Sequence, residues 1–264
     1  MSWTVVALGG HLLAQGGGDV AEALRPLGAP LAITHGNGPQ VGEELIRAPG
    51  TPIHIAVART QGELGSRIAG ELGAVAVITH VRVGEDDSAF ERPTKPIGPW
   101  LPEEPAGPSI HDPERGWRRV VASPRPREIV ELEQIRAVLA SGASVVCCGG
   151  GGIPLGSDGG VDAVIDKDRA SALLAASLYS PRLVVLTDVD AVYRDFRTPA
   201  ERSLEALTAE EAEALLPELP EGSMRPKLEA CAAFVRATGG EALVTSPEAL
   251  AEALAGRAGT RVAP

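Results

Sequence analysis

Three apolar, β-branched runs each end directly in a glycine-rich turn, and this pattern constrains the possible folds more than any other feature of the chain. The runs are "WTVVALGG" (residues 3–10), "APLAITHGNGPQVG" (29–42) and "ASVVCCGGGGIP" (143–154). Such runs are typical of parallel strands that are buried on both faces. The carboxyl ends of parallel strands meet at one edge of a sheet, so we expect the three turns to lie close together.

Helical patterns alternate with strands through the second half of the chain. Residues 126–142 carry apolar side chains at Ile129, Leu132, Ile135 and Leu139, and Gly142 follows as the expected helix end. Further helices are expected over residues 166–180, 209–219, 224–240 and 246–256, with strands beginning at 182 and 241. This alternation predicts a mainly parallel sheet that is covered by helices on both faces.

Residues 85–126 depart from this alternation. They are rich in proline, glycine and charged residues, which favours turns and irregular segments over long regular elements. We therefore expect an excursion that leaves the main sheet and returns to it. In its first half lies "RPTKPIGPW" (92–100), which contains a lysine.

That lysine is unusual, because only three of the 24 lysine and arginine residues are lysines. Lys95 lies in "PTKPIGP", Lys167 lies between two aspartates in "VIDKD", and Lys227 follows a proline in "MRPK". Codon bias towards arginine could leave a few lysines at random. The alternative, which these positions favour, is that a compact point charge is needed to contact a transferred phosphoryl group.

Composition excludes several classes of function. The net charge of −11 and an aromatic content of 3% argue against a nucleic-acid partner. No apolar run approaches the length of a membrane span, and the start of the chain does not resemble a signal peptide. The cysteines at 147, 148 and 231 fit neither a zinc nor a redox spacing. We expect a reduced, cytoplasmic protein.

Glycine-rich turns let backbone N–H groups approach anionic oxygens. Gly9–Gly10, Gly36–Gly38 and Gly149–Gly152 therefore predict a phosphate-handling site, although a tight turn is the commoner reason for any single glycine pair. The sequence contains neither a P-loop nor a dinucleotide-binding glycine motif.

Several longer motifs run in order over nearly the whole chain. They are "ALGG", "ITHGNGPQVG", "PTKPIGP", "GWRRVV", "CGGGGIP", "GVDAVIDKDRASALLA", "LTDVDAVY" and "GSMRPK". In these motifs the chain resembles carbamate kinases, a family within the amino acid kinase superfamily. The resemblance implies a three-layer α/β/α sandwich formed as one domain over residues 1–264. It also implies a small protruding subdomain near residues 85–126, and a homodimer.

The same resemblance implies reversible phosphoryl transfer between ATP and carbamate, giving ADP and carbamoyl phosphate, with Mg²⁺ held mainly by the nucleotide phosphates. Lys167 and Lys227 would contact the phosphates, and Lys95 would close over the substrate from a mobile excursion. The implied substrate-binding residues are Gly9, Gly10, His11, Gly36, Asn37, Gly38, Gly149 and Gly150. The implied nucleotide-binding residues are Asp166, Thr187, Asp188, Val189, Tyr193 and Met224.

The chain departs from the family in two ways. His11 follows the first glycine pair where the family has asparagine, and the segments around the first turns and the excursion are short. We expect a first helix of two to three turns. His11 leaves open a kinase of the same fold that acts on another small acid or phosphate ester. A third possibility is a nucleotide-binding regulator without turnover.

Overall fold

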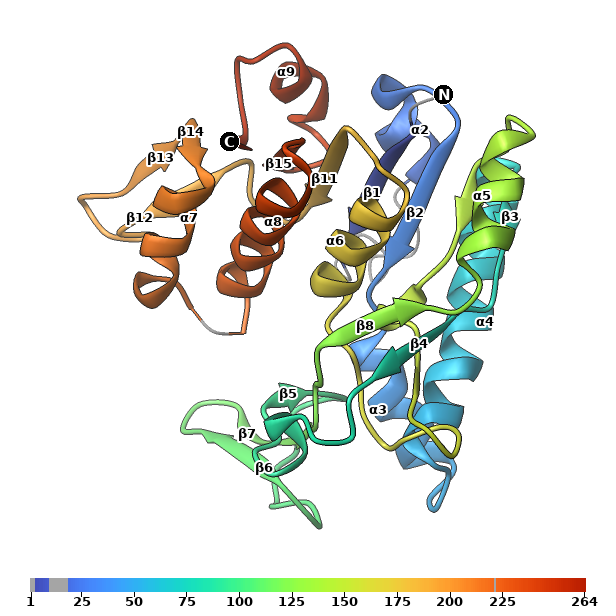
Figure 1. Ribbon diagram of the computed structural model, residues 1–264. Helices are drawn as coiled ribbons and strands as arrows, with labels where there is room; N and C mark the ends of the chain where they lie inside the picture. The colour runs from blue at the N-terminus through green and yellow to red at the C-terminus, as the bar shows by residue number, and fades with distance from the viewer. Residues whose placement is uncertain (1–2, 10–18, 221) are drawn as a thin grey trace.

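A computed structural model describes residues 3–9, 19–220 and 222–264. Eight strands form the central sheet in the order β14-β16-β15-β11-β1-β2-β9-β3 (Figure 1). In chain order they are β1 (Thr4–Leu8), β2 (Leu31–His35), β3 (Val75–Ala76), β9 (Val145–Val146), β11 (Arg182–Leu186), β14 (Ala206–Thr208), β15 (Glu241–Thr245) and β16 (Thr260–Ala263). The neighbouring strands β3, β9, β2, β1, β11 and β15 are parallel to one another, and β16 runs antiparallel to β15.

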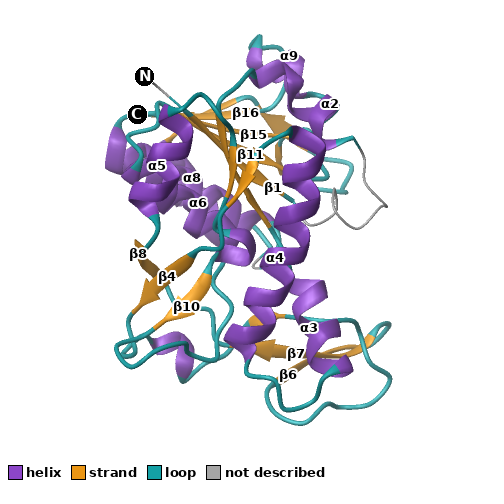
Figure 2. Ribbon diagram, turned by 90° about the vertical axis from the view of Figure 1, so that its right-hand side faces the viewer, coloured by secondary structure: helices purple, strands orange, loops and turns teal. Residues whose placement is uncertain are grey.

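Helices cover both faces of this sheet, as Figure 2 shows with the strands seen between two helical layers. One layer holds α5 (Leu132–Ala140), α6 (Lys167–Ser177), α7 (Ala209–Leu215) and α8 (Met224–Thr238). The other holds α2 (Val20–Leu24), α4 (Ile53–Leu72) and α9 (Leu250–Leu254). Each layer closes its own apolar core, because side chains that alternate along β1 and β11 point to opposite faces. The predicted three-layer α/β/α fold is confirmed.

Smaller elements extend the carboxyl edge of the sheet. A protruding three-stranded sheet at the bottom of Figure 1 has the order β5-β7-β6. Its strands are β5 (Lys95–Pro96), β6 (Ser109–Asp112) and β7 (Gly116–Val121). A second small sheet, β10-β4-β8, links it to the main body, and α3 (Gly38–Arg47) packs beside it. The remaining strands are β4 (His80–Val83), β8 (Pro126–Ile129), β10 (Ile153–Leu155), β12 (Val192–Arg194) and β13 (Arg202–Leu204).

The structure corrects part of the expectation for residues 126–142. The first four residues form β8, and the helix begins only at Leu132. Ile129 is buried as a strand residue that pairs with Val81 of β4. A single apolar residue at this spacing fits either periodicity, so the pattern alone could not place the boundary.

The first helix and the final helix are both short. Within the described residues, α2 has five residues and continues as a three-residue 3₁₀ turn, together about two turns. The final helix, α9, has five residues, and the backbone N–H of Ala249 before it bonds to the Ser246 hydroxyl. None of the helices in the described ranges combines the length and apolar character that crossing a bilayer requires.

The 20-residue helix α4 and the strand β16 were not predicted from the sequence.

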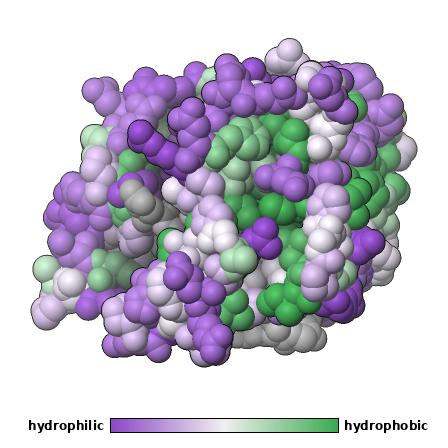
Figure 3. All heavy atoms as spheres, turned by 90° about the horizontal axis from the view of Figure 1, so that it is seen from below, coloured by the Kyte–Doolittle hydropathy of each residue, from purple (hydrophilic) through white to green (hydrophobic). Residues whose placement is uncertain are grey.

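Viewed from below, the surface is largely hydrophilic with apolar patches (Figure 3). Ile46 of α3 and Ile55 of α4 are among the exposed apolar residues, at 56% and 38% exposure.

Candidate active site

The N-terminus of α6 organises the candidate site. Asp166 is the N-cap, and its Oδ1 accepts hydrogen bonds from the backbone N–H groups of Asp168 at 2.9 Å and Arg169 at 3.3 Å. These bonds satisfy two of the N–H groups that a helix leaves free at its start. The cap thereby fixes the direction in which Lys167, the first residue of α6, leaves the backbone.

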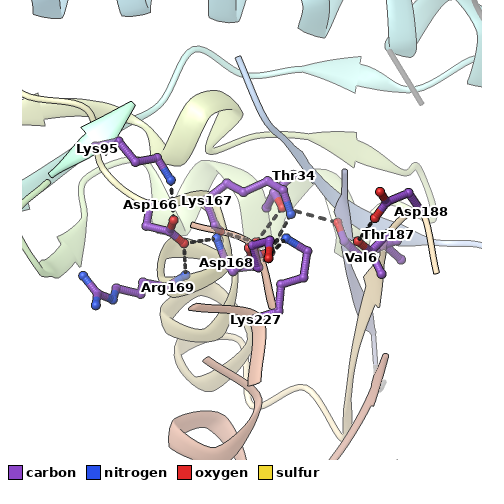
Figure 4. Close-up of polar contacts among 12 residues, drawn as sticks. Val6, Thr34, Lys95, Asp166, Lys167, Asp168, Arg169, Thr187, Asp188 and Lys227 are labelled. Carbon is purple, nitrogen blue, oxygen red and sulfur yellow. Dashed lines mark hydrogen bonds and ion pairs between the residues drawn. The ribbon is translucent and has the colours of Figure 1, made fainter. Parts of the chain in front are cut away.

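All three lysines of the chain meet at this helix start (Figure 4). Lys167 Nζ lies 2.5 Å from Oδ1 of Asp168, and Lys227 Nζ, from the first turn of α8, lies 3.4 Å from Oδ2 of the same carboxylate. Lys95 reaches from β5 and pairs with Oδ2 of Asp166. The positions of the lysines therefore do not fit random leftovers on a solvated face.

Burial and pairing oppose one another in this cluster. Burial lowers the pKa of Lys167, and the carboxylate of Asp168 limits the fall. Burial also opposes the charge on Lys227, but Asp168 and then Asp166 outweigh it and raise the pKa of that ammonium. For Asp166, burial is again opposed, here by the charge and hydrogen bond of Lys95, which hold its pKa well below the usual range.

The lysines line a first cavity of about 260 Å³. It brings together predicted residues from five segments of the chain: Gly36, Asn37, Gly38, Lys95, Gly150, Asp166, Lys167 and Lys227. Arg118 of β7 and Asp168 also line it. Four cationic side chains face two carboxylates there, so the lining carries a net positive charge that suits an anionic substrate.

Close packing explains why most positions of the third turn, Gly149–Gly152, are glycine. A Cβ on Gly149 would lie 2.3 Å from Nε2 of His35, and one on Gly150 would lie 2.1 Å from Nδ2 of Asn37. Gly149 is buried and does not line the first cavity, whereas Gly150 does. Asn37 donates from Nδ2 to the hydroxyl of Thr60 at 2.9 Å. Burial lowers the pKa of His35 to about 4, so its ring is neutral near pH 7.

The first glycine turn is only partly described. The backbone N–H of Gly9, after β1, donates to the carbonyl of Leu186 at 2.9 Å, and a Cβ there would lie 2.9 Å from the same oxygen. Gly9 therefore allows β1 and β11 to end in close contact. Gly10 and His11 lie outside the described residues.

A second cavity of about 300 Å³ lies beside the first. It is lined by the predicted nucleotide residues Thr187, Asp188, Val189, Tyr193 and Met224. Lys227 and Gly222 line both cavities, so the two cavities adjoin at these residues. Asp166, the remaining residue of the predicted nucleotide set, lies in the first cavity.

The sequence did not predict several side chains that line these cavities, among them Asp168, Arg118 and Phe196. Asp168 was interpreted only as an acidic residue at a helix start, although it contacts two of the lysines. Arg118 comes from "GWRRVV", a motif that had no assigned role. Phe196 lines the second cavity beside Tyr193, with ring centroids 5.7 Å apart. For Asp168, the placement of Lys167 between two aspartates in "DKD" was a sequence signal that could have indicated its role.

A cationic cavity that shares a lysine with a neighbouring cavity, at the carboxyl edge of a parallel sheet, is the arrangement that a phosphoryl-transfer enzyme requires. Residues 2–246 match the amino acid kinase family. A carbamate kinase of Halobacterium salinarum is 44% identical over 100% of this chain and 99% of its own length. That of Escherichia coli K12 is 39% identical over 98% and 99%.

Solved structures also match this chain over nearly its whole length. Carbamate kinase from Giardia lamblia bound to AMP-PNP superposes with a TM-score of 0.87 and 33% identity, covering 99% of this chain and 98% of that one. The chain therefore belongs to the amino acid kinase family and, within it, to the carbamate kinases. The Halobacterium alignment spans 304 positions against 264 residues here, so this chain lacks segments that its relative has.

Proposed function

We propose that the protein transfers a phosphoryl group reversibly between ATP and carbamate, with the nucleotide in the second cavity and carbamate in the first. The observation that carries this proposal is Lys227, which lines both cavities and pairs with Asp168 of the first cavity. An oxygen of carbamate attacks the γ-phosphorus, and the bond from that phosphorus to the bridging oxygen of ADP breaks. In the reverse direction ADP attacks carbamoyl phosphate.

The lysines have different tasks in this scheme. Charge in such a transition state spreads over the phosphoryl oxygens, so catalysis depends on positioned cations. Lys227, at the junction, suits the nucleotide phosphates, and Lys167, on the rigid start of α6, suits the group in transfer. Lys95, across the first cavity, suits the carbamoyl phosphate side.

Asp168 and Asp166 set these cations before substrate arrives. Asp168 holds Lys167 and Lys227 on its two oxygens, and Asp166 holds Lys95. The turn formed by Gly36 and Gly38 presents backbone to the same space, at the start of α3. Helix starts and glycine turns favour bound anions, which is consistent with carbamate beside this turn.

This site suits a Mg²⁺ ion that is bound mainly by the nucleotide phosphates. Among the described residues there is no cluster of three potential metal-ligating His, Cys, Asp or Glu side chains, and lysines engage both Asp166 and Asp168. Asp188, in the second cavity, is the carboxylate that would assist the nucleotide phosphates in holding the ion. Bound there, Mg²⁺ would neutralise phosphate charge.

The test is to incubate the protein with MgADP and carbamoyl phosphate and to measure ATP with luciferase. We expect ATP formation that is lost in Lys167→Ala and on chelation of Mg²⁺. Nucleotide binding without ATP formation would favour a regulator. ATP formation only from acetyl phosphate would favour another acid as substrate, the possibility that His11 raises, and His11→Asn should then shift preference towards carbamoyl phosphate.

We also propose a homodimer formed at the β3 edge of the central sheet. Among the described residues, β3 has a strand partner on one side alone, and the apolar residues Val75 and Ile78 at this edge are 42% and 45% exposed. Exposed strand edges with apolar side chains are sites of chain association. Light scattering should give twice the monomer mass, and Ile78→Lys should lower it; a monomer at working concentration would contradict the proposal.

A further inference from the structure

Two glycines from different motifs touch backbone to backbone beside the first cavity. Gly42 belongs to α3, and Gly98 lies in the protruding segment, three residues after Lys95. A Cβ built on Gly42 would lie 2.0 Å from Cα of Gly98 and 2.1 Å from its nitrogen. Carbon atoms pack at about 3.5–4.0 Å, so any side chain at Gly42 would push the protruding segment away from α3 by more than about 1 Å.

The backbone of Gly98 is also held through both of its polar groups. Its N–H donates to the carbonyl of Gly38 at 3.1 Å, and its carbonyl accepts from Nε of Arg118 at 2.9 Å. Gly38 and Arg118 both line the first cavity. The preceding residue, Ile97, is 1% exposed and packs with Val41 of α3 in a separate apolar cluster.

The contact between the two glycines restricts the position of the segment that carries Lys95. The sequence suggested a lysine on a mobile excursion, and that motion stays a prediction. In the structure, the segment that carries Lys95 is docked on α3, the helix that follows the "HGNG" turn. A displacement of the backbone of this docked segment relative to α6 must therefore either carry α3 along or break the contact between the two glycines.

We propose that Gly42 is a positioning residue, which sets how closely Lys95 approaches Asp166 and the first cavity. The proposal rests on the catalytic role proposed above for Lys95. Glycine within a helix costs about 1 kcal/mol relative to alanine, so α3 would be more stable by itself with alanine at this position. The close approach to Gly98 supplies the reason for glycine.

The experiment compares Gly42→Ala with Gly70→Ala. Gly70 is an exposed glycine of α4, and a Cβ there would have nothing within 4 Å. Both changes add one methyl to a helix, but only the first opens the contact with Gly98. A misplacement of about 1 Å can cost about 10²-fold in rate. We expect that loss in kcat/KM for carbamoyl phosphate with Gly42→Ala, unchanged MgADP affinity by calorimetry, and wild-type kinetics with Gly70→Ala.

Combination with Lys95→Ala separates positioning from a general packing defect. If Gly42 acts through Lys95, adding Gly42→Ala to Lys95→Ala should lower turnover by less than about twofold further. Multiplicative losses would overturn the proposal, as would wild-type turnover of Gly42→Ala. A harmless Lys95→Ala would instead refute the role of Lys95 itself.

A second variant covers the case in which Gly42→Ala fails to fold. Ile97→Ala removes apolar contacts from the same docked segment without introducing a clash. It should lower kcat/KM for carbamoyl phosphate while sparing MgADP affinity, and it too should have little effect in the Lys95→Ala background. Equal losses in both backgrounds would contradict the proposal.

Discussion

Asp168→Asn should disable the enzyme through the charge of the lysines and leave the shape of the site intact. The side chain of Asp168 is 3% exposed and separates two ammonium groups, with Lys167 at 2.5 Å and Lys227 at 3.4 Å. Asparagine has the same size but carries no charge. The variant therefore removes the carboxylate that pairs with both buried cations and leaves them the weaker attraction of Asp166.

The size of the effect follows from these contacts. Removing one partner of a buried ion pair costs about 3–5 kcal/mol, and loss of a nearby opposite charge shifts a pKa by about 1–3 units. Burial already lowers the pKa of Lys167, and Asp168 is the group that most opposes this. In the variant the pKa of Lys167 should fall further. Since the ammonium form stabilises the phosphoryl oxygens, turnover should be lost at a lower pH than in the wild type.

The assay is the pH dependence of ATP formation from MgADP and carbamoyl phosphate, with Asp86→Asn as the control. Asp86 forms an exposed ion pair with Arg127, so its replacement should change neither rate nor profile. For Asp168→Asn we expect a loss of about 10²–10³ near pH 8, and an alkaline limb moved to lower pH. Turnover like the wild type with an unmoved alkaline limb would refute the role of Asp168.

Substitutions at other residues should have smaller or more selective effects on turnover, ligand affinity or stability. Lys95→Ala should lower turnover and apparent carbamoyl phosphate affinity while calorimetry shows unchanged MgADP binding, and Lys95→Arg should be nearly as damaging, because a planar fork cannot replace a point charge. Asp166→Ala should lower the free energy of unfolding in urea by more than about 1 kcal/mol, because it removes the α6 cap and also the ion pair with Lys95. The pKa of His35 falls from 6.5 to about 4 on burial, so the unfolded chain binds more protons between these values. The free energy of unfolding should therefore drop by up to about 3 kcal/mol from pH 6.5 to 4, and His35→Gln should lack that part of the drop.

The central strands could be predicted because local sequence determined them. β1, β2 and β11 are continuous apolar runs, and such runs have few alternatives to a buried parallel strand. Helix α4 was missed because its start offers no side-chain cap and its interior contains glycines, which disfavour helix. Its helical state depends on packing against the sheet and against α3.

The glycine turns show what local sequence could not decide. Phosphate binding and close packing both select glycine. In the structure Gly149 packs against His35, while Gly150 packs against Asn37 and also lines the first cavity. The contact between Gly42 and Gly98 depends on how two distant segments dock, and nothing in either motif indicates the other. The same holds for Asp168, whose second lysine comes from α8.

The charge of the whole chain and the charge of the site have opposite signs, and this explains why the few lysines matter. A net charge of −11 repels an anionic substrate, so capture must depend on local groups. Lys95, Lys167 and Lys227 supply three of the four cations of the first cavity, and two aspartates hold them there. An incoming phosphoryl group can displace an ammonium from a carboxylate by rotation of its flexible stem. A bidentate arginine pair would resist such an exchange, which is a physical reason for lysine in a chain that otherwise uses arginine.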